Sequence, residues 1–120
     1  ELVAERAIRV LFICHFNRKR SATAERVFAK DPTLDVRSAG TNEDALVRVN
    51  SRMLEWADLV FTMDPEQGRA LDAMFPAHPA LAKIKCLEIA DVYNFLDPEL
   101  VALLHERTAP HLEKLKLAGG

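Results

Sequence analysis

The chain has 120 residues, 49% of them hydrophobic, which suits one globular domain (1–120) with its own core and is too short for two. Its formal net charge of −2 argues against a surface that coats nucleic acid, and its two cysteines are too few for a disulfide framework. No run of about 18 apolar residues could cross a membrane, and Glu1–Arg6 lacks the pattern of a signal peptide. We therefore expect a cytoplasmic protein that binds neither membrane nor nucleic acid, with a monomer favoured.

Strand and helix patterns alternate along the chain. The apolar run after Ala7 predicts a first strand, and later apolar runs bounded by Pro, Gly and Asp predict three more. The expected strands are Ile8–Cys14, Leu34–Ser38, Asp58–Met63 and Ile84–Ile89, and the expected helices are Ser21–Lys30, Asn50–Ala57, Pro65–Met74 and Pro98–Thr108. This order predicts an α/β fold with three layers, in which a four-stranded parallel sheet is flanked by helices. Ligands of such sheets bind at the carboxyl ends of the strands.

Several helix boundaries have recognisable signals. Asn50 or Ser51 can cap the second helix, and the pairs Asp64-Pro65 and Asp97-Pro98 are typical of a cap followed by a first-turn proline. Pro110 predicts a break or kink before a last turn at His111–Leu117.

The most informative stretch is Cys14-x5-Arg20-Ser21, between the first strand and the first helix. A loop that opens a helix directs backbone N–H groups and the positive end of the helix dipole at one spot, which favours an anion. Cys14 at the edge of that spot is favoured as a thiolate nucleophile. Arg20 can bind two phosphoryl oxygens in parallel, and Ser21 can cap the helix or donate its hydroxyl to the sulfur.

This stretch is therefore predicted to bind phosphate, through the residues His15, Phe16, Asn17, Arg18, Lys19, Arg20 and Ser21. The simpler alternative is that Cys14 only packs at the end of a strand and that the basic residues form a solvated turn. The position between a strand and a helix favours the functional interpretation.

Segments along nearly the whole chain resemble the low-molecular-weight protein tyrosine phosphatases. Val10–Glu25 is similar to the start of that family's sequences, Ser38–Thr41 to the turn after their second strand, and Trp56–Asp64 to their third strand and the residues that follow it. Asp91-Val92-Tyr93 resembles the Asp-Pro-Tyr that carries the general acid. The segment Asp97-Pro98-Glu99-Leu100 adds a likeness to a short bacterial branch of predicted tyrosine phosphatases.

Four positions depart from the family pattern. Phe16 stands where the family usually has glycine, and Lys19 where many members have a second cysteine. Ala22 and Val92 replace prolines. The backbone at Phe16 must therefore avoid conformations reserved for glycine, while the nucleophile and the arginine are retained. The resemblance implies a phosphomonoesterase, with phosphotyrosine as the leading substrate class and either a phosphoprotein or a small phosphate ester as the substrate.

A thiolate that displaces a phosphate ester forms a cysteinyl-phosphate, and one carboxyl can serve as acid for the leaving group and as base for water. Asp91 is the candidate because it directly follows the fourth strand, although it could also satisfy a turn. Asp97 is the other candidate for the general acid, but its position before Pro98 is already explained by a role as helix cap. His15 is expected to point away from the nucleophile.

The remaining candidates concern the surroundings of the loop. Phe16 and Tyr93 could form walls of the substrate pocket, or either could be partly buried filler. Asn17 holds the loop's shape, as the resemblance implies, and Arg18 and Lys19 are interpreted as charges at the substrate entrance. No cofactor is expected. No metal site is expected either, because His78, His105 and His111 lack ligand spacing.

Two other functions stay open. Arsenate mimics phosphate, but a thioredoxin-linked arsenate reductase needs further cysteines, and only Cys86 remains, in an apolar segment that suggests burial. A non-catalytic phosphate-binding module would not need a thiolate. The sequence therefore favours a cysteine-dependent phosphatase in which Cys14, Arg20 and Asp91 are the catalytic residues.

Overall fold

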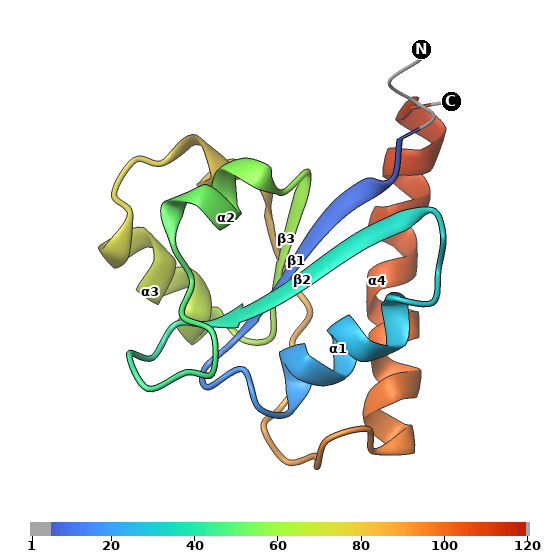
Figure 1. Ribbon diagram of the computed structural model, residues 1–120, viewed down its shortest axis with the longest axis horizontal. Helices are drawn as coiled ribbons and strands as arrows, with labels where there is room; N and C mark the ends of the chain where they lie inside the picture. Colours follow the sequence, from blue (N-terminus) through green and yellow to red (C-terminus); the bar gives the residue numbers. More distant parts are fainter. Residues whose placement is uncertain (1–5, 120) are drawn as a thin grey trace.

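The computed structural model describes residues 6–119, so the predictions on residues 1–5 and Gly120 lie outside the described residues. Its centre is a parallel sheet with the strand order β2-β1-β3-β4 (Figure 1). The strands are β1 (Ile8–Cys14), β2 (Leu34–Gly40), β3 (Leu59–Thr62) and β4 (Ile84–Cys86). In the register of the sheet, Phe12 of β1 lies between Ser38 of β2 and Phe61 of β3. The predicted fold class is confirmed.

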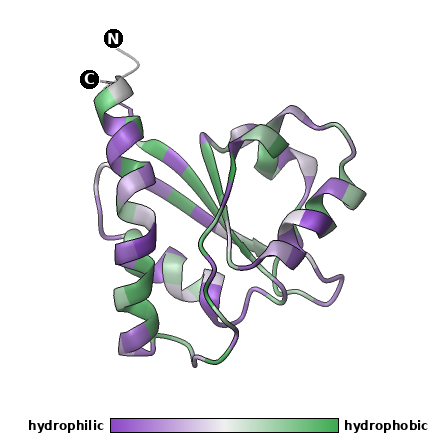
Figure 2. Ribbon diagram, turned by 180° about the vertical axis from the view of Figure 1, so that it is seen from behind, coloured by the Kyte–Doolittle hydropathy of each residue, from purple (hydrophilic) through white to green (hydrophobic). Residues whose placement is uncertain are grey.

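Helices cover both faces of this sheet. They are α1 (Arg20–Phe28), α2 (Ser51–Trp56), α3 (Pro65–Met74) and α4 (Pro98–Gly119), with a 3-10 turn, Pro79–Lys83, before β4. One core cluster joins the sheet to α1 and α4, and the other joins it to α2 and α3. Seen from behind, the helices carry hydrophobic and hydrophilic residues on different sides (Figure 2). The result is three layers with two cores.

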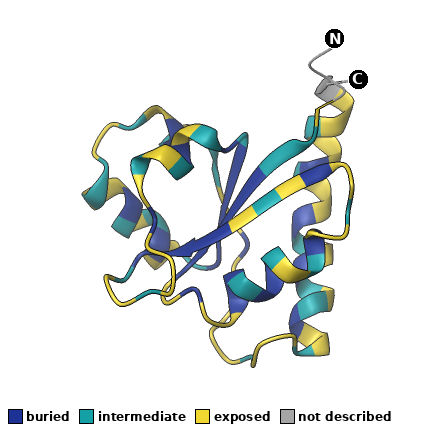
Figure 3. Cartoon of the chain, viewed as in Figure 1, coloured by how far each residue is buried: buried dark blue, intermediate teal, exposed yellow. Residues whose placement is uncertain are grey.

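Alternation along β1 supplies both cores. Val10 and Phe12 belong to the cluster with α1 and α4, whereas Leu11 and Ile13 belong to the cluster with α2 and α3. All four side chains are fully buried, and β1 and β3 form the buried centre of the molecule (Figure 3). Successive side chains of a strand point to opposite faces, so Cys14 continues the side of Phe12.

All three predicted helix starts have the expected caps, since Asp97 accepts a hydrogen bond from the N–H of Glu99 at the start of α4. The side chain of Asn50 accepts a hydrogen bond from the backbone N–H of Met53, so Asn50 and not Ser51 caps α2. Asp64 and Gln67 form a reciprocal capping box at the start of α3, with Pro65 as its first residue. A cap of this kind satisfies N–H groups that the helix itself leaves free.

The fourth strand is shorter than predicted, and Cys86 is exposed rather than buried. β4 lies at the edge of the sheet and pairs only with β3. The residues after β4 form no regular strand, although Leu87 and Ile89 are buried. Their N–H groups donate hydrogen bonds to the carbonyls of Thr62 and Met63, respectively. A short edge strand leaves side chains uncovered, which the apolar pattern alone did not reveal.

Pro110 does not end the last helix, so of the two predicted outcomes, a break or a kink, the break is wrong. α4 runs without interruption from Pro98 to Gly119. Leu104 and Leu112, on either side of the proline, are buried in the same core cluster, while Pro110 itself is exposed. Packing on both sides thus keeps the two halves in one helix, at the cost of one backbone hydrogen bond. No helix in the described part of the chain is long and apolar enough to span a membrane.

Candidate active site

Cys14 is the last residue of β1 and lies at the bottom of an open pocket. The residue is 3% exposed. The pocket has a volume of about 250 Å³ and is lined by Cys14, His15, Phe16, Arg18, Lys19, Arg20 and Asp91. Three of these residues were predicted to be catalytic, and the structure brings them together from β1, α1 and the loop after β4.

The sulfur of Cys14 lies 2.9 Å from the hydroxyl oxygen of Ser21 and accepts a hydrogen bond of 3.2 Å from the backbone N–H of Asn17. The amide of Asn17 donates to the same Ser21 oxygen at 2.8 Å. The hydroxyl hydrogen of Ser21 must then point elsewhere, and the sulfur is a closer acceptor than the Ala39 carbonyl at 3.4 Å. Two donors directed at the sulfur stabilise the thiolate.

Of its two predicted roles, Ser21 therefore donates its hydroxyl to the sulfur and does not cap the helix. Helix α1 begins at Arg20, one residue earlier than expected, and no side chain caps it. Its first N–H groups are left for another acceptor at the pocket, and an anion satisfies both these groups and the helix dipole.

Asn17 carries the backbone conformation that a glycine would otherwise supply. Its φ is 59°, in the left-handed region that asparagine tolerates better than most residues, whereas Phe16 has no such angle. The Asn17 amide also donates to Ser38 at 2.9 Å, and the Ser38 hydroxyl donates to Glu25 of α1. Phe16 therefore replaces glycine without strain, and Asn17 holds the loop between β2 and α1.

Gly40, at the end of β2, allows the next segment to pass close to the loop. A Cβ at this position would lie 2.5 Å from the carbonyl oxygen of His15 and 2.7 Å from the Cβ of Ala45. The N–H groups of Thr41 and Asn42 bond to the carbonyls of Cys14 and His15 at 3.1 and 3.0 Å. Only glycine fits this close approach of two backbones.

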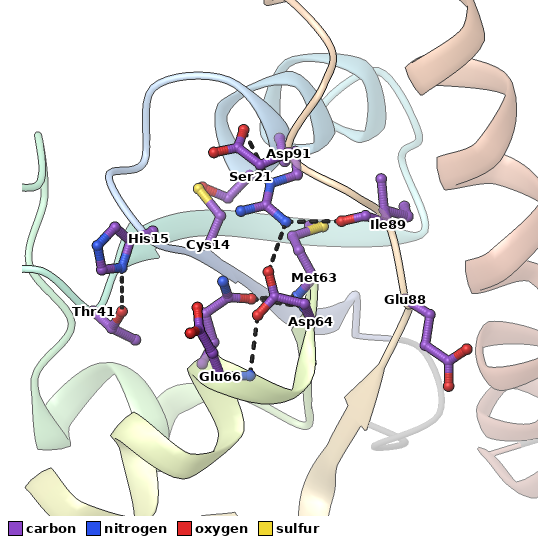
Figure 4. A network of polar contacts seen from close by, with 12 residues as sticks. Cys14, His15, Ser21, Thr41, Met63, Asp64, Glu66, Glu88, Ile89 and Asp91 are labelled. Atoms are coloured by element: carbon purple, nitrogen blue, oxygen red, sulfur yellow. Dashed lines mark hydrogen bonds and ion pairs between the residues drawn. The ribbon is translucent and has the colours of Figure 1, made fainter.

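The ring of His15 points away from the sulfur, as expected. Its Nδ1 lies 3.5 Å from the hydroxyl of Thr41 (Figure 4), and its Nε2 lies 3.3 Å from the amide of Asn42. The side chain thus contacts the segment after β2, and a role as the base that activates Cys14 is not supported by this geometry.

Arg20 is hydrogen-bonded through Nη1 of its guanidinium, whereas its Nε has only the longer ion pair of 3.7 Å with Asp91. Its Nη1 donates to the carbonyl of Ile89 at 2.7 Å and to Asp64 at 3.0 Å (Figure 4). The residue is 3% exposed, and its second Nη donates to no acceptor among residues 6–119. Nε and this second Nη form one edge of the guanidinium, which suits two oxygens of a phosphoryl group.

Asp64 was predicted only as a helix cap, yet it also positions Arg20. Burial alone would raise the pKa of Asp64, but hydrogen bonds from Arg20 and Gln67 and the charge of Arg20 lower the pKa overall. A signal was available in the sequence, because an aspartate two residues after the end of β3 lies beside the loop that follows the neighbouring strand β1.

The two candidate acids lie in different surroundings. Asp91 lines the pocket, its side chain is 58% exposed, and its carboxylate lies 3.7 Å from Nε of Arg20. Asp97 accepts a hydrogen bond from the N–H of Glu99 at 2.9 Å and is a cap of α4 outside the pocket. The geometry favours Asp91 for contact with a bound phosphate ester.

Phe16 and Tyr93 were predicted as walls of the pocket, but only Phe16 lines it. Phe16 is 41% exposed at the mouth of the pocket. Tyr93 is partly buried against the core cluster of Phe12 and does not line the pocket, so the alternative that it fills space is what the structure shows. Within residues 6–119, no group of three or more His, Cys, Asp or Glu side chains is arranged to hold a metal ion.

Comparisons with solved structures identify the same fold. The arginine phosphatase YwlE from Geobacillus stearothermophilus has a TM-score of 0.68 at 21% identity, over 92% of this chain and 96% of the other. The tyrosine phosphatase Wzb from Escherichia coli, solved with phosphate, has a TM-score of 0.71 at 22% identity, over 89% and 97% of the two chains. A low-molecular-weight phosphotyrosine phosphatase from Vibrio cholerae has a TM-score of 0.68 at 19% identity, over 95% and 100%.

No protein-family model matches the chain, and no curated protein matches it in sequence. The structural likeness nevertheless extends over nine-tenths of the chain, so the fold resemblance is not confined to one motif. The chain has the fold of the low-molecular-weight protein tyrosine phosphatases.

Proposed function

We propose that the protein is a phosphomonoesterase that acts through a cysteinyl-phosphate intermediate, with phosphotyrosine as its substrate class. One observation carries the proposal: the buried Cys14, whose sulfur has two hydrogen-bonding partners, shares a pocket with Arg20 and with the exposed carboxyl of Asp91. A module that only bound phosphate would not need the thiolate.

In the first step, the Cys14 thiolate attacks phosphorus and the bond from phosphorus to the ester oxygen breaks. The free edge of Arg20 and the unbonded N–H groups at the start of α1 stabilise the charge on the three equatorial oxygens. Asp91, protonated at this stage, gives its proton to the departing oxygen.

In the second step, Asp91 takes a proton from water, and the water oxygen attacks phosphorus. The bond between sulfur and phosphorus breaks, the electron pair returns to Cys14, and inorganic phosphate leaves. Ser21 donates a hydrogen bond to the sulfur that departs in this step, which stabilises the thiolate as it re-forms.

The pocket entrance favours an aromatic leaving group over a guanidinium. Phe16 can stack on a phenol ring at the mouth of the pocket. Arg18 and Lys19 also line it, and like charges at an interface are unfavourable, so the cationic guanidinium of phosphoarginine is disfavoured. We therefore infer the tyrosine activity of Wzb rather than the arginine activity of YwlE.

Arsenate reduction is the less favoured alternative. Its thioredoxin-linked form passes oxidising equivalents between cysteines, and the only other cysteine, Cys86, lies on the edge strand outside the pocket. An arsenate-dependent disulfide that involves Cys14 would favour this alternative.

The test is hydrolysis of phosphotyrosine in the presence of a chelator, with phosphoarginine as the competing substrate. The native protein should hydrolyse phosphotyrosine faster, and Cys14→Ser should abolish the reaction. Asp91→Asn should lower the rate by roughly 10², whereas Asp97→Asn should leave it unchanged. Activity that persists in Cys14→Ser, or a faster reaction with phosphoarginine, would contradict the proposal.

A further inference from the structure

Two cations at the pocket have no acidic partner. Arg18 and Lys19 are exposed and line the pocket, and neither takes part in an ion pair or a side-chain hydrogen bond within residues 6–119. The other arginine of the loop, Arg20, is by contrast anchored by Asp64 and Ile89.

The phosphoryl group does not require these two cations. Its oxygens are already served by Arg20, the N–H groups of the loop and the start of α1. Arg18 and Lys19 lie in the same loop on exposed positions, whereas the groups that face the sulfur are buried. Their charge is therefore available to a second anionic group outside the phosphoryl site.

Exposed apolar side chains adjoin residues that line the pocket. Leu46 is 64% exposed, and its N–H bonds to the carbonyl of Phe16, which places it next to the pocket mouth. Val92 directly follows Asp91 and is 75% exposed, and Phe95 of the same loop is also exposed. A small phosphate ester would leave this rim uncovered, whereas a peptide can cover it on both sides of the phosphorylated residue.

We infer that Arg18 and Lys19 bind an acidic side chain adjacent to the phosphorylated residue of a peptide substrate, while the apolar rim contacts its further residues. This inference rests on the proposed function and names the substrate class of the same pocket. Charge complementarity of this kind contributes mainly to specificity and to the rate of association.

The experiment compares two phosphotyrosine peptides that differ only in the neighbours of the phosphotyrosine, Asp and Glu in one and Asn and Gln in the other. For the native protein, kcat/KM should be roughly tenfold higher for the acidic peptide at low salt, the size expected of two exposed ion pairs. The preference should shrink as salt is raised.

In the double variant Arg18→Gln with Lys19→Gln, kcat/KM should fall roughly tenfold further on the acidic peptide than on the neutral one, so that the preference is lost. The matched control, Arg26→Gln with Lys30→Gln, removes the same charge from exposed positions at the far end of α1. The control should retain the preference. An equal loss on both peptides in the first variant would show that these cations act on the phosphoryl group alone, which would overturn the inference.

Binding separates this inference from the proposed function. Cys14→Ala removes the nucleophile, and its affinity for the two peptides is measured without turnover. Preferential binding of the acidic peptide supports the inference even if the native protein hydrolyses nothing, in which case only the proposed function fails. Equal binding of both peptides overturns it, as does tighter binding of a small aryl bisphosphate that depends on Arg18 and Lys19.

Discussion

The two carboxylate oxygens of Asp64 have different partners. One forms an ion pair with Arg20, and the other caps α3 by accepting a hydrogen bond from the N–H of Glu66. Asparagine is an equally good cap, so Asp64→Asn should preserve the helix and remove only the anchor. A guanidinium displaced by about 1 Å can cost roughly 10² in rate, and we expect a fall in kcat/KM of that order. The measurement is steady-state hydrolysis of an aryl phosphate, alongside thermal unfolding.

The control for this variant is Asp97→Asn, which changes the corresponding cap of α4 away from the pocket. It should match the native protein in both rate and stability. If Asp64→Asn were as active as the native protein, the anchoring role of Asp64 would be wrong.

Asn17 combines a backbone conformation with three hydrogen bonds around the sulfur. Asn17→Gly keeps the conformation and loses the side-chain bonds, whereas Asn17→Ala loses both. The alanine variant should therefore be less stable than the glycine variant by about 1 kcal/mol, and both should be less active than the native protein. Urea unfolding of the two variants measures the difference, and equal stability would contradict the strain argument.

At the scale of elements, β1 and α3 agreed with the sequence and α4 did not. The β1 prediction matched because every residue from Val10 to Ile13 is apolar and both faces of the strand are covered. The break at Pro110 was wrong because a local rule was applied where buried leucines on both sides decide the outcome. The exposure of Cys86 likewise depends on which strand forms the edge, a property of the whole sheet.

Because α4 is continuous, its two prolines can be compared for their effect on stability. Pro110 lies in the helix interior, where proline costs about 3 kcal/mol relative to alanine in exposed positions, partly offset by its restriction of the unfolded chain. Pro110→Ala should therefore raise the free energy of unfolding by about 1 to 2 kcal/mol. Pro98→Ala, at the first position of the same helix, should have little effect. Chemical denaturation of both variants measures this, and a destabilised Pro110→Ala would show that the proline is accommodated without cost.

At the scale of the whole molecule, three aspartates link stability to pH. Hydrogen bonds lower the pKa of Asp58, chiefly through Arg6, and the pKa of Asp31, chiefly through Thr33, while Asp64 is lowered despite its burial. These groups bind fewer protons in the folded state, so their contribution is present above the ordinary carboxyl pKa of about 4 and is lost as pH falls below it.

The free energy of unfolding should thus be nearly constant above about pH 5 and decline in acid. Asp58→Asn should lower stability at neutral pH and make the acid decline shallower. Urea unfolding from below about pH 4 up to neutral pH measures both effects, and an unchanged slope in the variant would exclude Asp58 as a contributor.

Much of the site could be predicted because its residues follow one another in a short loop. Cys14, Arg20 and Ser21 are fixed by the link between a strand and a helix, and Asp91 by its place after a strand. The anchoring of Arg20 by Asp64 and the packing of Tyr93 against the core depend on contacts between segments that are distant in the chain. Such contacts require the order of strands, which periodicity does not give.

Cys14, Asp64 and Asp91 come from the ends of β1, β3 and the segment after β4, and they meet only when these strands are paired in register. A chain in which β1 has paired with β2 alone has Cys14 and Arg20 in place but lacks Asp64 and Asp91 beside them. In the proposed mechanism, activity therefore returns during refolding only when the edge strand has docked, a step that burial of Phe12 or the formation of α1 would not report.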